Sequence, residues 1–566
     1  MNPMDAQRGI IFIGLAIVSY LMVLAWNDDY GNQPVTSPSA NVEVIESPSI
    51  SSNSTSNTSS DTEFTPPEEQ SSTVTDLTVS KNITSGSQKI RVKTDVLDIA
   101  INLTGGNISE ALLTQYKTAL GSAEKFALLE NSQRHQYTIE SGLYGKNGFD
   151  SSRNGPAPIY QTAEQHYELG SDRNELVVDL KYTDINGVEI IKRYRLERES
   201  YLVNVSYLVN NNSNTAFNTN FSGKIIRDQV ADPSQQTSMG MQSFLGMVLS
   251  SPKEPYEKYD FEDMRDKPIN STAQGGWIAF LQHYFMTAWI PADNLEHTYQ
   301  TKVKNGLYLM GFISPEVVVE PGQQETISAN VYIGPKIIEK LEQVAPNLDL
   351  AVDYGFLFFI AYPLYLLLDF LHGIVGNWGI AIILVTVIVK AAFFKLSATS
   401  YRSMANMRRV APKLAQLKEQ YGDDRQKMSQ GMMELYKKEK INPLGGCLPV
   451  LVQMPVFIAL YWVLLESVEL RHAPFFFWIH DLSIKDPYFI LPIIMGASMF
   501  IQMSLNPAPP DPVQAKVMKL MPIMFTVFFL WFPAGLVLYW VVNNVLSIAQ
   551  QWIITRNIEN AAAEKG

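Results

Sequence analysis

The chain has 566 residues, too many for one domain, and 44 Lys and Arg against 56 Asp and Glu give it a net charge of −12. Its mean hydropathy of −0.02 averages a polar region up to residue 350 with long apolar runs between residues 354 and 555. This pattern excludes a purely soluble protein and indicates a membrane protein with a large soluble domain. The single cysteine, Cys447, excludes an intramolecular disulfide.

The N-terminal region contains an apolar segment and a polar tether. Residues 10–26 are apolar, longer than the core of a signal peptide, and follow Arg8. We therefore predict that residues 1–29 are an uncleaved transmembrane anchor whose N-terminus is cytoplasmic. Residues 30–85 are rich in Ser, Thr, Asn and Pro, a composition that cannot bury enough apolar surface to fold. We predict a disordered tether there.

Residues 86–345 show short alternating runs separated by turn residues, which predict a β-sandwich. The clearest run is 175–196, where Asn186 and Gly187 separate two alternating segments and predict a hairpin. The histidines of this region have no metal-ligand spacing, and nothing in it indicates catalysis. We therefore predict no metal site and no catalytic residue.

The segment 354–373 is apolar but is interrupted by Pro363 and Asp369. Residues 395–440 hold 11 Lys and Arg against 5 Asp and Glu, so they are predicted to stay in the cytoplasm. Because the anchor delivers the chain to the outer side, only one crossing fits between the sandwich and this basic segment. We predict that residues 346–376 form an interfacial amphipathic helix instead.

Five further crossings are predicted in residues 377–555, and the last two are joined by a tight outer turn at Phe532–Gly535. Together with the anchor they make six transmembrane helices with both termini inside. A basic helical hairpin at 399–440, broken near Gly422, lies between the crossings 378–398 and 444–466. A short tail occupies 556–566. The predicted crossings are 378–398, 444–466, 488–505, 518–532 and 534–555.

Lys390 is the most informative residue, because it lies inside the apolar run 378–398. An ammonium group at that depth costs about 2.5–3.5 kcal/mol on insertion scales, so its first interpretation is functional. Thr386 lies one turn earlier on the same helical face. The alternative is that Lys390 snorkels to the interface, as we expect of Lys395.

Five segments of the chain are distinctive: GGWIAFLQHYFMTAWIP at 275–291, GNWGIAIILVTVIVK at 376–390, NPLGGCLPVLVQMPVFIALYW at 442–462, PFFFWIHDLSIKDPYFILP at 474–492 and FLWFPAGLVLYWVVNN at 529–544. Together they resemble the YidC-type membrane protein insertases of Gram-negative bacteria, in the YidC/Oxa/Alb family. The resemblance covers nearly the whole chain outside the tether.

This resemblance implies a five-helix insertase core, one further transmembrane anchor and a periplasmic β-supersandwich in the bacterial inner membrane. It implies a membrane protein insertase and folding chaperone, not an enzyme. Such a protein receives hydrophobic segments of nascent inner-membrane proteins in a hydrophilic groove and releases them sideways into lipid, alone or with the Sec translocon. The sequence has no GxxxxGK[ST] motif, and we expect no cofactor.

The resemblance also assigns roles to six residues. Lys390 takes the place of the groove cation, which is usually Arg, and Thr386 is its polar neighbour. Gln453 and, more weakly, Gln502 are expected to line the groove, with an interhelical hydrogen bond as the alternative for Gln453. Tyr539 and Trp540 are expected to contact substrate helices. The alternative for these two residues is core packing or interface anchoring.

The sequence departs from the family in two further places. Lys395 stands where relatives often have Pro, so we expect the helix to run straighter into the hairpin. The tail 556–566 is near neutral, so ribosome contact is expected through the basic hairpin 399–440 rather than through the tail.

Two other functions stay open at this point. The first is a secondary transporter that uses Lys390 as an intramembrane site, although we find no inverted repeat. The second is a carbohydrate enzyme in the soluble domain, which would need a paired acid and base in a cleft. The sequence contains no base-reading motif, so we expect no sequence-specific nucleic-acid partner.

Overall fold

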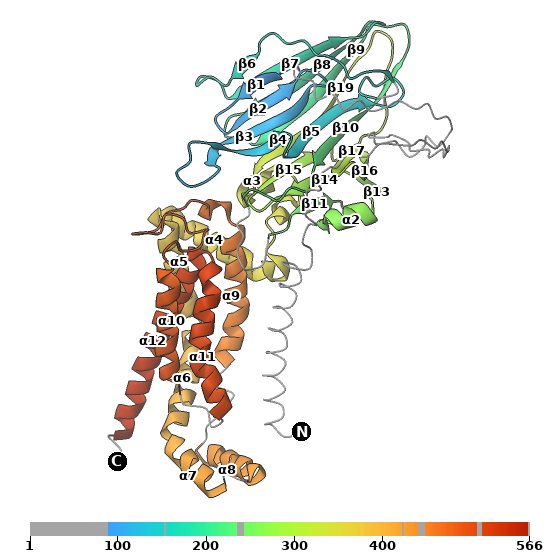
Figure 1. Cartoon of the computed structure of the whole chain (residues 1–566). Coiled ribbons are helices and arrows are strands. Elements are labelled where there is room, and N and C mark those ends of the chain that lie inside the picture. Colours follow the sequence, from blue (N-terminus) through green and yellow to red (C-terminus); the bar gives the residue numbers. More distant parts are fainter. Residues whose placement is uncertain are drawn as a thin grey trace, which may run out of the picture. The chain divides into compact units, whose positions relative to one another are not determined.

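The computed structural model describes residues 89–151, 154–234, 243–421, 424–439, 448–506 and 512–563. It consists of a β-rich domain followed by a bundle of helices (Figure 1). The predicted anchor at 1–29 and the tether at 30–85 lie outside the described residues.

The β-rich domain is built from two sheets, as the alternating runs predicted. The first has 11 strands and the second has 8. The first contains, in spatial order, β13 (Asn270–Gln274), β16 (Glu296–Lys304), β17 (Leu307–Ile313), β10 (Phe217–Arg227), β5 (Gln136–Tyr144), β4 (Lys125–Asn131), β3 (Asn107–Lys117), β2 (Leu97–Asn102), β1 (Lys89–Lys93) and β6 (His166–Glu168), with β18 (Val317–Val319) also paired to β10. The second contains β12 (Glu257–Tyr259), β11 (Gly246–Ser250), β14 (Trp277–Leu281), β15 (Phe285–Ile290), β19 (Gln324–Pro335), β9 (Leu202–Asn211), β8 (Val188–Glu197) and β7 (Glu175–Thr183).

The predicted hairpin is present as β7 and β8. The Asp184 carboxylate accepts hydrogen bonds from the backbone N–H groups of Asn186 (2.9 Å) and Val188 (2.7 Å), and Gly187 adopts a φ of 93°. Glycine reaches such a φ without steric cost, so the turn and its register are set locally. Alternate residues of β8 are buried, which confirms the interpretation of the sequence pattern.

Aromatic side chains from both sheets fill the core between them. The ring of Phe221 on β10 contacts Trp289 on β15 at 6.1 Å, and Tyr137 on β5 contacts Phe280 on β14 at 5.6 Å. A Cβ atom at Gly223 would lie 2.6 Å from the Trp289 ring, so only glycine allows the sheets to approach there. The prediction of a β-sandwich is confirmed.

Three short helices and one longer helix connect the sandwich to the rest of the bundle. The short ones are α3 (Ile338–Val344), η2 (Leu348–Ala351) and η3 (Gly355–Leu357), and the longer one is α4 (Phe358–Val375). One face of α4 packs on α5 and α9, and the other exposes large apolar side chains such as Phe359 and Phe370. By length and composition, Gly355–Val375 meets the requirements of a membrane span. That α4 lies in the interface therefore stays a prediction.

The bundle contains α5 (Trp378–Ala392), α6 (Phe394–Arg409), α9 (Leu448–Glu466), α10 (Ile490–Ser504), α11 (Pro512–Phe528) and α12 (Ala534–Ala563). In the described part of the chain, two helices are long and apolar enough to span a membrane, Gly355–Val375 and Ala534–Ile558. A third span results if α5 and α6 are counted together. Six crossings therefore stay a prediction, and α12 continues as a helix into the predicted tail.

One expectation about the bundle is wrong. The angle between α5 and α6 is 68°, so the helix does not run straight into the hairpin although Lys395 replaces Pro. The break falls at Phe393, whose backbone has φ −91° and ψ 9°. Beyond it, α6 packs against α12 and α9 and buries Ser397 and Ser400, so tertiary packing rather than a proline fixes the bend.

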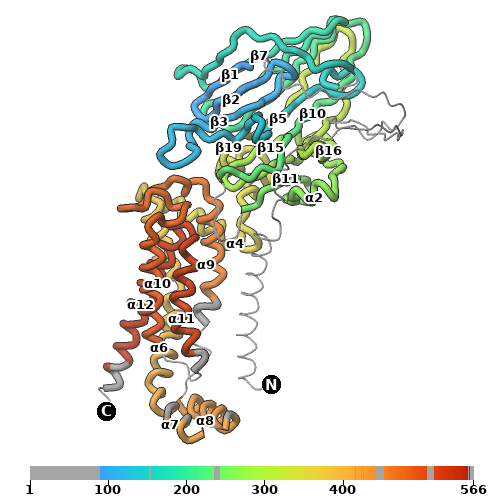
Figure 2. Tube along the Cα trace, in the orientation of Figure 1, coloured from blue at the N-terminus to red at the C-terminus, as the bar shows by residue number. Residues whose placement is uncertain are grey.

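The hairpin beyond α6 consists of α7 (Ala411–Tyr421) and α8 (Arg425–Lys438), which pack against each other (Figure 2). The Asp424 side chain caps α8 by accepting hydrogen bonds from the N–H groups of Gln426 and Lys427, each at 3.1 Å. The predicted break between two helices is present at this position. A second break at Val410 separates α6 from α7.

Candidate functional site in the helical bundle

Lys390 lies in the last turn of α5, with 8% of its surface exposed. No acidic side chain in the described ranges forms an ion pair with it. The C-terminal end of a helix favours a cation, which offsets part of the cost of burial. Lys395, five residues later, is exposed. The two lysines therefore differ in burial, and snorkelling stays the alternative interpretation of Lys390.

Thr386 lies one turn before Lys390 on the same buried face of α5. Its hydroxyl donates a 2.6 Å hydrogen bond to the Ile382 carbonyl, so its proton is used within the helix. The oxygen keeps an accepting lone pair. Val387 and Ile388, on the opposite face, are each 41% exposed. The helix thus turns a polar stripe inward and an apolar one outward.

The predicted aromatic residues form part of a packed cluster. The Phe457 ring on α9 lies 5.9 Å from Tyr539 and 4.8 Å from Trp540, both on α12. Trp540 also meets Phe529 edge-on at 5.7 Å. Tyr539 is buried, which fits core packing, whereas the buried Trp540 Nε1–H has no hydrogen-bond partner in the described structure. An unpaired donor of this kind is available to a polar group that enters the bundle.

The two predicted glutamines are half-buried on different helices. Gln453 lies on α9 four residues before Phe457, so both lie on one helical face, the face that meets α12. Gln502 lies near the end of α10. No hydrogen bond joins either glutamine to Lys390 among the residues that the structure describes.

A row of buried polar side chains on α12 escaped the sequence analysis. Asn544, Ser547 and Gln551 recur at three- and four-residue spacing on one face. Asn544 donates to Ser498 Oγ on α10 at 3.0 Å, and Gln551 donates to Asn506 Oδ1 at 2.9 Å. We call Asn544, Ser547 and Gln551 the α12 stripe. Its periodicity within an apolar helix was the signal that would have revealed it.

The α12 stripe continues from the level of Lys390 toward the C-terminal end of α12. A Cβ atom at Gly535 would lie 3.4 Å from Ile382 Cδ1, so the start of α12 lies beside α5. Because both helices run in the same direction, one and two turns further bring Thr386 and then Lys390 to the levels of Tyr539 and Asn543. Polar groups thus line the half of the bundle beyond this level.

The opposite end of the bundle is tightly closed. The backbone N–H of Ala534 donates to the Ile484 carbonyl at 2.7 Å, and that of Gly535 donates to Leu482 at 2.9 Å. Phe528 and Phe532 pack with ring centroids 4.7 Å apart just before this turn. A polar interior that is closed at one end suits a group that enters from the other.

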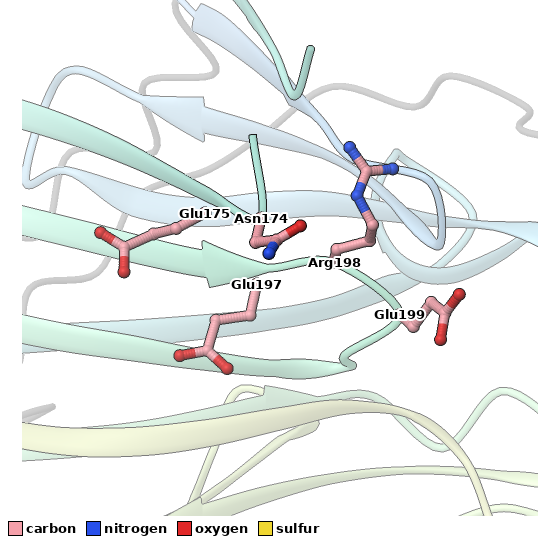
Figure 3. A pocket seen from close by; sticks show the side chains of 5 residues that line it. All are labelled: Asn174, Glu175, Glu197, Arg198 and Glu199. Carbon is pink, nitrogen blue, oxygen red and sulfur yellow. The ribbon is translucent and has the colours of Figure 1, made fainter. Parts of the chain in front are cut away.

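A shallow cavity of about 390 Å³ lies on the sandwich and is lined by Asn174, Glu175, Glu197, Arg198 and Glu199 (Figure 3). Glu175 is paired with Arg195 at 3.1 Å, and Figure 3 shows Glu199 pointing away from the other two carboxylates. Glu197 lies directly opposite Glu175 on the neighbouring strand, so these two carboxylates lie on one face of the sheet, where Arg195 pairs with Glu175. Within the described ranges, no three His, Cys, Asp or Glu side chains are grouped to hold a metal ion.

The fold is that of a membrane protein in which a β-sandwich precedes a bundle of apolar helices with buried polar side chains. Residues 370–561 match the family model described as 60Kd inner membrane protein, and residues 89–367 match that of the YidC periplasmic domain. The chain belongs to the YidC family of membrane protein insertases. Accordingly it is an inner-membrane protein with its sandwich in the periplasm, and an insertase rather than an enzyme.

Relatives of similar length support this assignment. A membrane protein insertase YidC of Marinobacter nauticus is 57% identical over 573 residues, covering 99% of this chain and all of that protein. One of Hahella chejuensis is 57% identical over 572 residues with the same coverage. A solved structure of an active YidC insertase is 16% identical, covers 82% of this chain and 92% of its own, and has a TM-score of 0.37. The transporter alternative finds no support in these comparisons.

Proposed function

We propose that the bundle receives a hydrophobic segment of a nascent inner-membrane protein with its polar flank, and releases the apolar part sideways into lipid. The observation that carries this proposal is Lys390, which is buried without an acidic partner in the described structure. An unpaired buried cation costs free energy unless a partner arrives. We infer that the partner is an acidic or polar group of the substrate.

The polar flank is the difficult part of the substrate to move. Each of its unsatisfied polar groups costs several kcal/mol in hydrocarbon. The α12 stripe and Lys390 shorten the dry distance, because they supply hydrogen bonds and a charge over half of the bundle. At a separation of about 4 Å a cation and an anion attract by roughly 4 kcal/mol when the effective dielectric constant is near 20.

The apolar part of the substrate drives the reaction forward. Its burial in lipid yields roughly 25 cal/mol per Å² of apolar surface. The exposed faces of α11, with Leu520 and Ile523, and of α10, with Ile493, offer an apolar path along the bundle. On this account Tyr539 and Trp540 contact the passing helix, while Gln453 and Gln502 line the path and Thr386 supports Lys390.

The topology and the partners form part of the same proposal. We infer six crossings with both termini in the cytoplasm, which places the closed end of the bundle outside and the α12 stripe toward the cytoplasm. The basic hairpin would then face ribosomes, and the apolar bundle surface would face lipid and the Sec translocon. Lys413 and Glu439 pair at 2.6 Å between α7 and the end of α8 and hold the hairpin together.

Reconstitution in liposomes tests this function. The purified full chain is compared with empty liposomes for protease protection of a small single-spanning substrate with an acidic tail. We expect protection with wild type and a loss of it with Lys390→Ala. Lys395→Ala is the matched control, since it removes an equal charge from an exposed position, and it should insert normally. Protection that does not exceed that of empty liposomes with any variant would contradict the insertase function.

A further inference from the structure

The outer end of α9 is held by a buried ion pair with the sandwich. Lys336, which directly follows β19, places its Nζ atom 2.8 Å from Glu466 Oε2, and Glu466 is the last residue of α9. The two side chains are 2% and 1% exposed. The backbone N–H of Lys336 donates to the Tyr284 carbonyl at 2.9 Å, which fixes the lysine to the sandwich. The end of α9 is thus bound to the sandwich by the ion pair between Lys336 and Glu466.

His283 adds a second contact at the same helix end. Its Nε2 lies 2.9 Å from the Leu465 carbonyl, one of the carbonyls left without a helical partner at a C-terminus. Because a carbonyl only accepts, Nε2 carries the proton. Its backbone N–H donates to Asp232 Oδ2 at 2.7 Å, and its ring stacks on Tyr284 at 3.8 Å. Burial lowers the pKa of His283, so the ring is neutral beside the ion pair.

The loop after α9 is fastened to the sandwich as well. Arg471 donates through Nη2 to the carbonyls of Lys117 at 2.7 Å and Thr118 at 3.1 Å. Its guanidinium lies 5.4 Å from the centre of the Phe126 ring and 5.6 Å from that of Phe285. The contact therefore extends over more than one residue on each side.

A buried charge pair is a poor way to gain stability. Replacing such a pair by apolar residues of similar volume is often neutral or stabilising, whereas a charged pair fixes one relative placement. The helix fixed here carries Gln453 and Phe457, and Phe457 contacts Tyr539 and Trp540. Glu466 lies 13 residues beyond Gln453, or roughly 20 Å along the helix.

We propose that the sandwich positions α9 through Lys336 and His283, and that Lys336 is a positioning residue for the insertion site. This inference rests on the proposed insertase function. It gives the periplasmic domain a mechanical role: the domain holds the outer end of α9 so that the face with Gln453 stays against α12. Loss of the contacts that Lys336 and His283 make with the end of α9 would let α9 tilt and would separate Phe457 from Tyr539 and Trp540.

The test uses the full chain in liposomes with four variants. Lys336→Met removes one charge, and Lys336→Met with Glu466→Met removes both at similar volume. Lys336→Glu with Glu466→Lys exchanges the charges. Lys340→Met is the matched control, because Lys340 lies on α3 and donates to the Glu199 carbonyl of the sandwich rather than to the bundle. Each is scored for insertion, for thermal unfolding, and for crosslinking of a photoreactive group at position 453 to the substrate.

We expect Lys336→Met to lower insertion roughly tenfold, because a tilted α9 misplaces the groups that contact the substrate, and to shift the crosslinks made from position 453. The double Met variant should unfold like wild type yet insert poorly, and the exchanged pair should regain most insertion. Full insertion by the double Met variant, with unchanged crosslinks, would overturn the positioning role. If wild type inserts in the same experiment, the proposed insertase function still stands. Failure of wild type to insert would instead contradict the function itself.

Discussion

Lys390 and Lys395 show how two equal charges on neighbouring turns differ by environment. Lys390 is buried in α5 and Lys395 is exposed at the start of α6. The sequence identified both positions but left snorkelling open for Lys390, since the orientation of a helix about its axis depends on its neighbours. The contacts of α5 with α4, α6 and α12 decide that orientation.

The charge at position 390, rather than the exact side chain, should matter. Lys390→Arg keeps a cation and adds donors, so we expect insertion of an acidic-tailed substrate to stay within about twofold of wild type. Lys390→Gln, which keeps polarity but removes the charge, should insert roughly tenfold more slowly. Rates of protease protection in liposomes measure both. Equal rates for the two variants would show that polarity alone suffices.

Glu469 predicts a pH dependence of stability in the periplasmic region. Burial, with the Glu339 and Asp369 carboxylates adding to it, raises the pKa of Glu469 from 4.5 to about 7. The folded state binds this proton more tightly than the unfolded chain. The resulting stability is complete below about pH 4.5 and is lost as the pH rises through about 7.

Glu469→Gln should remove this pH dependence. Near pH 8 we expect the variant to be more stable than wild type by about 1–3 kcal/mol, because it no longer has a buried carboxylate to ionise. The Tyr365 hydroxyl, 3.4 Å from Glu469 Oε1 and 3.0 Å from Glu339 Oε1, stays available to Glu339. Thermal unfolding at pH 5 and pH 8 measures the difference. Parallel pH profiles of the two proteins would contradict the assignment to Glu469.

At the scale of elements, α12 combines two faces within one helix. The α12 stripe is buried, whereas Val545 and Trp552 are 52% and 51% exposed. Apolar runs in the sequence identified the helix but not its inner face, because Asn and Ser within such a run do not interrupt it. Their three- and four-residue spacing carries that information, and the contact with Ser498 shows which neighbour they meet.

Water should reach the α12 stripe but not the lipid side. After Cys447→Ser, a cysteine introduced by Ser547→Cys should react with a membrane-impermeant thiol reagent added from the cytoplasmic side. Val545→Cys, two residues away on the exposed apolar face, should react far more slowly. Labelling rates in inverted membrane vesicles make the comparison. Equal protection of both cysteines would contradict a wet interior.

The bend between α5 and α6 shows where local pattern fails. A proline would have signalled a break, and its absence at Lys395 predicted a straighter helix. The structure nevertheless turns by 68°, since Ser397 and Ser400 are buried by the packing of α6. By contrast, the β7–β8 hairpin followed from sequence alone because Asp184 and Gly187 determine its turn locally.

At the scale of the whole molecule, the contact between sandwich and bundle was beyond sequence reasoning. Lys336 and Glu466 are 130 residues apart, and neither belongs to a motif. The division into a soluble and a membrane region, in contrast, was predictable because composition changes abruptly near residue 350. The number of crossings stays a prediction, since the described helices meet the criteria for two or three spans.

The sandwich should lack carbohydrate chemistry. A fragment of residues 86–345 is expected to show β-rich circular dichroism, because its aromatic core lies within the domain. In its cavity the Glu175 carboxylate is paired with Arg195, so we expect no epimerisation of aldose anomers above the spontaneous rate. Polarimetry of freshly dissolved glucose and galactose measures this. Acceleration that disappears in Glu175→Gln or Glu197→Gln would revive the enzyme alternative.

A double-mutant cycle between Lys390 and the substrate tail tests the central claim most directly. Insertion rates are measured in liposomes for wild type, Lys390→Ala and Lys395→Ala, each with an acidic-tailed and a neutral-tailed version of one substrate. We predict that Lys390→Ala slows the acidic version roughly tenfold more than the neutral one, and that Lys395→Ala leaves both rates at the wild-type level. Equal slowing of both tails by Lys390→Ala would contradict a direct role for this charge in receiving the substrate.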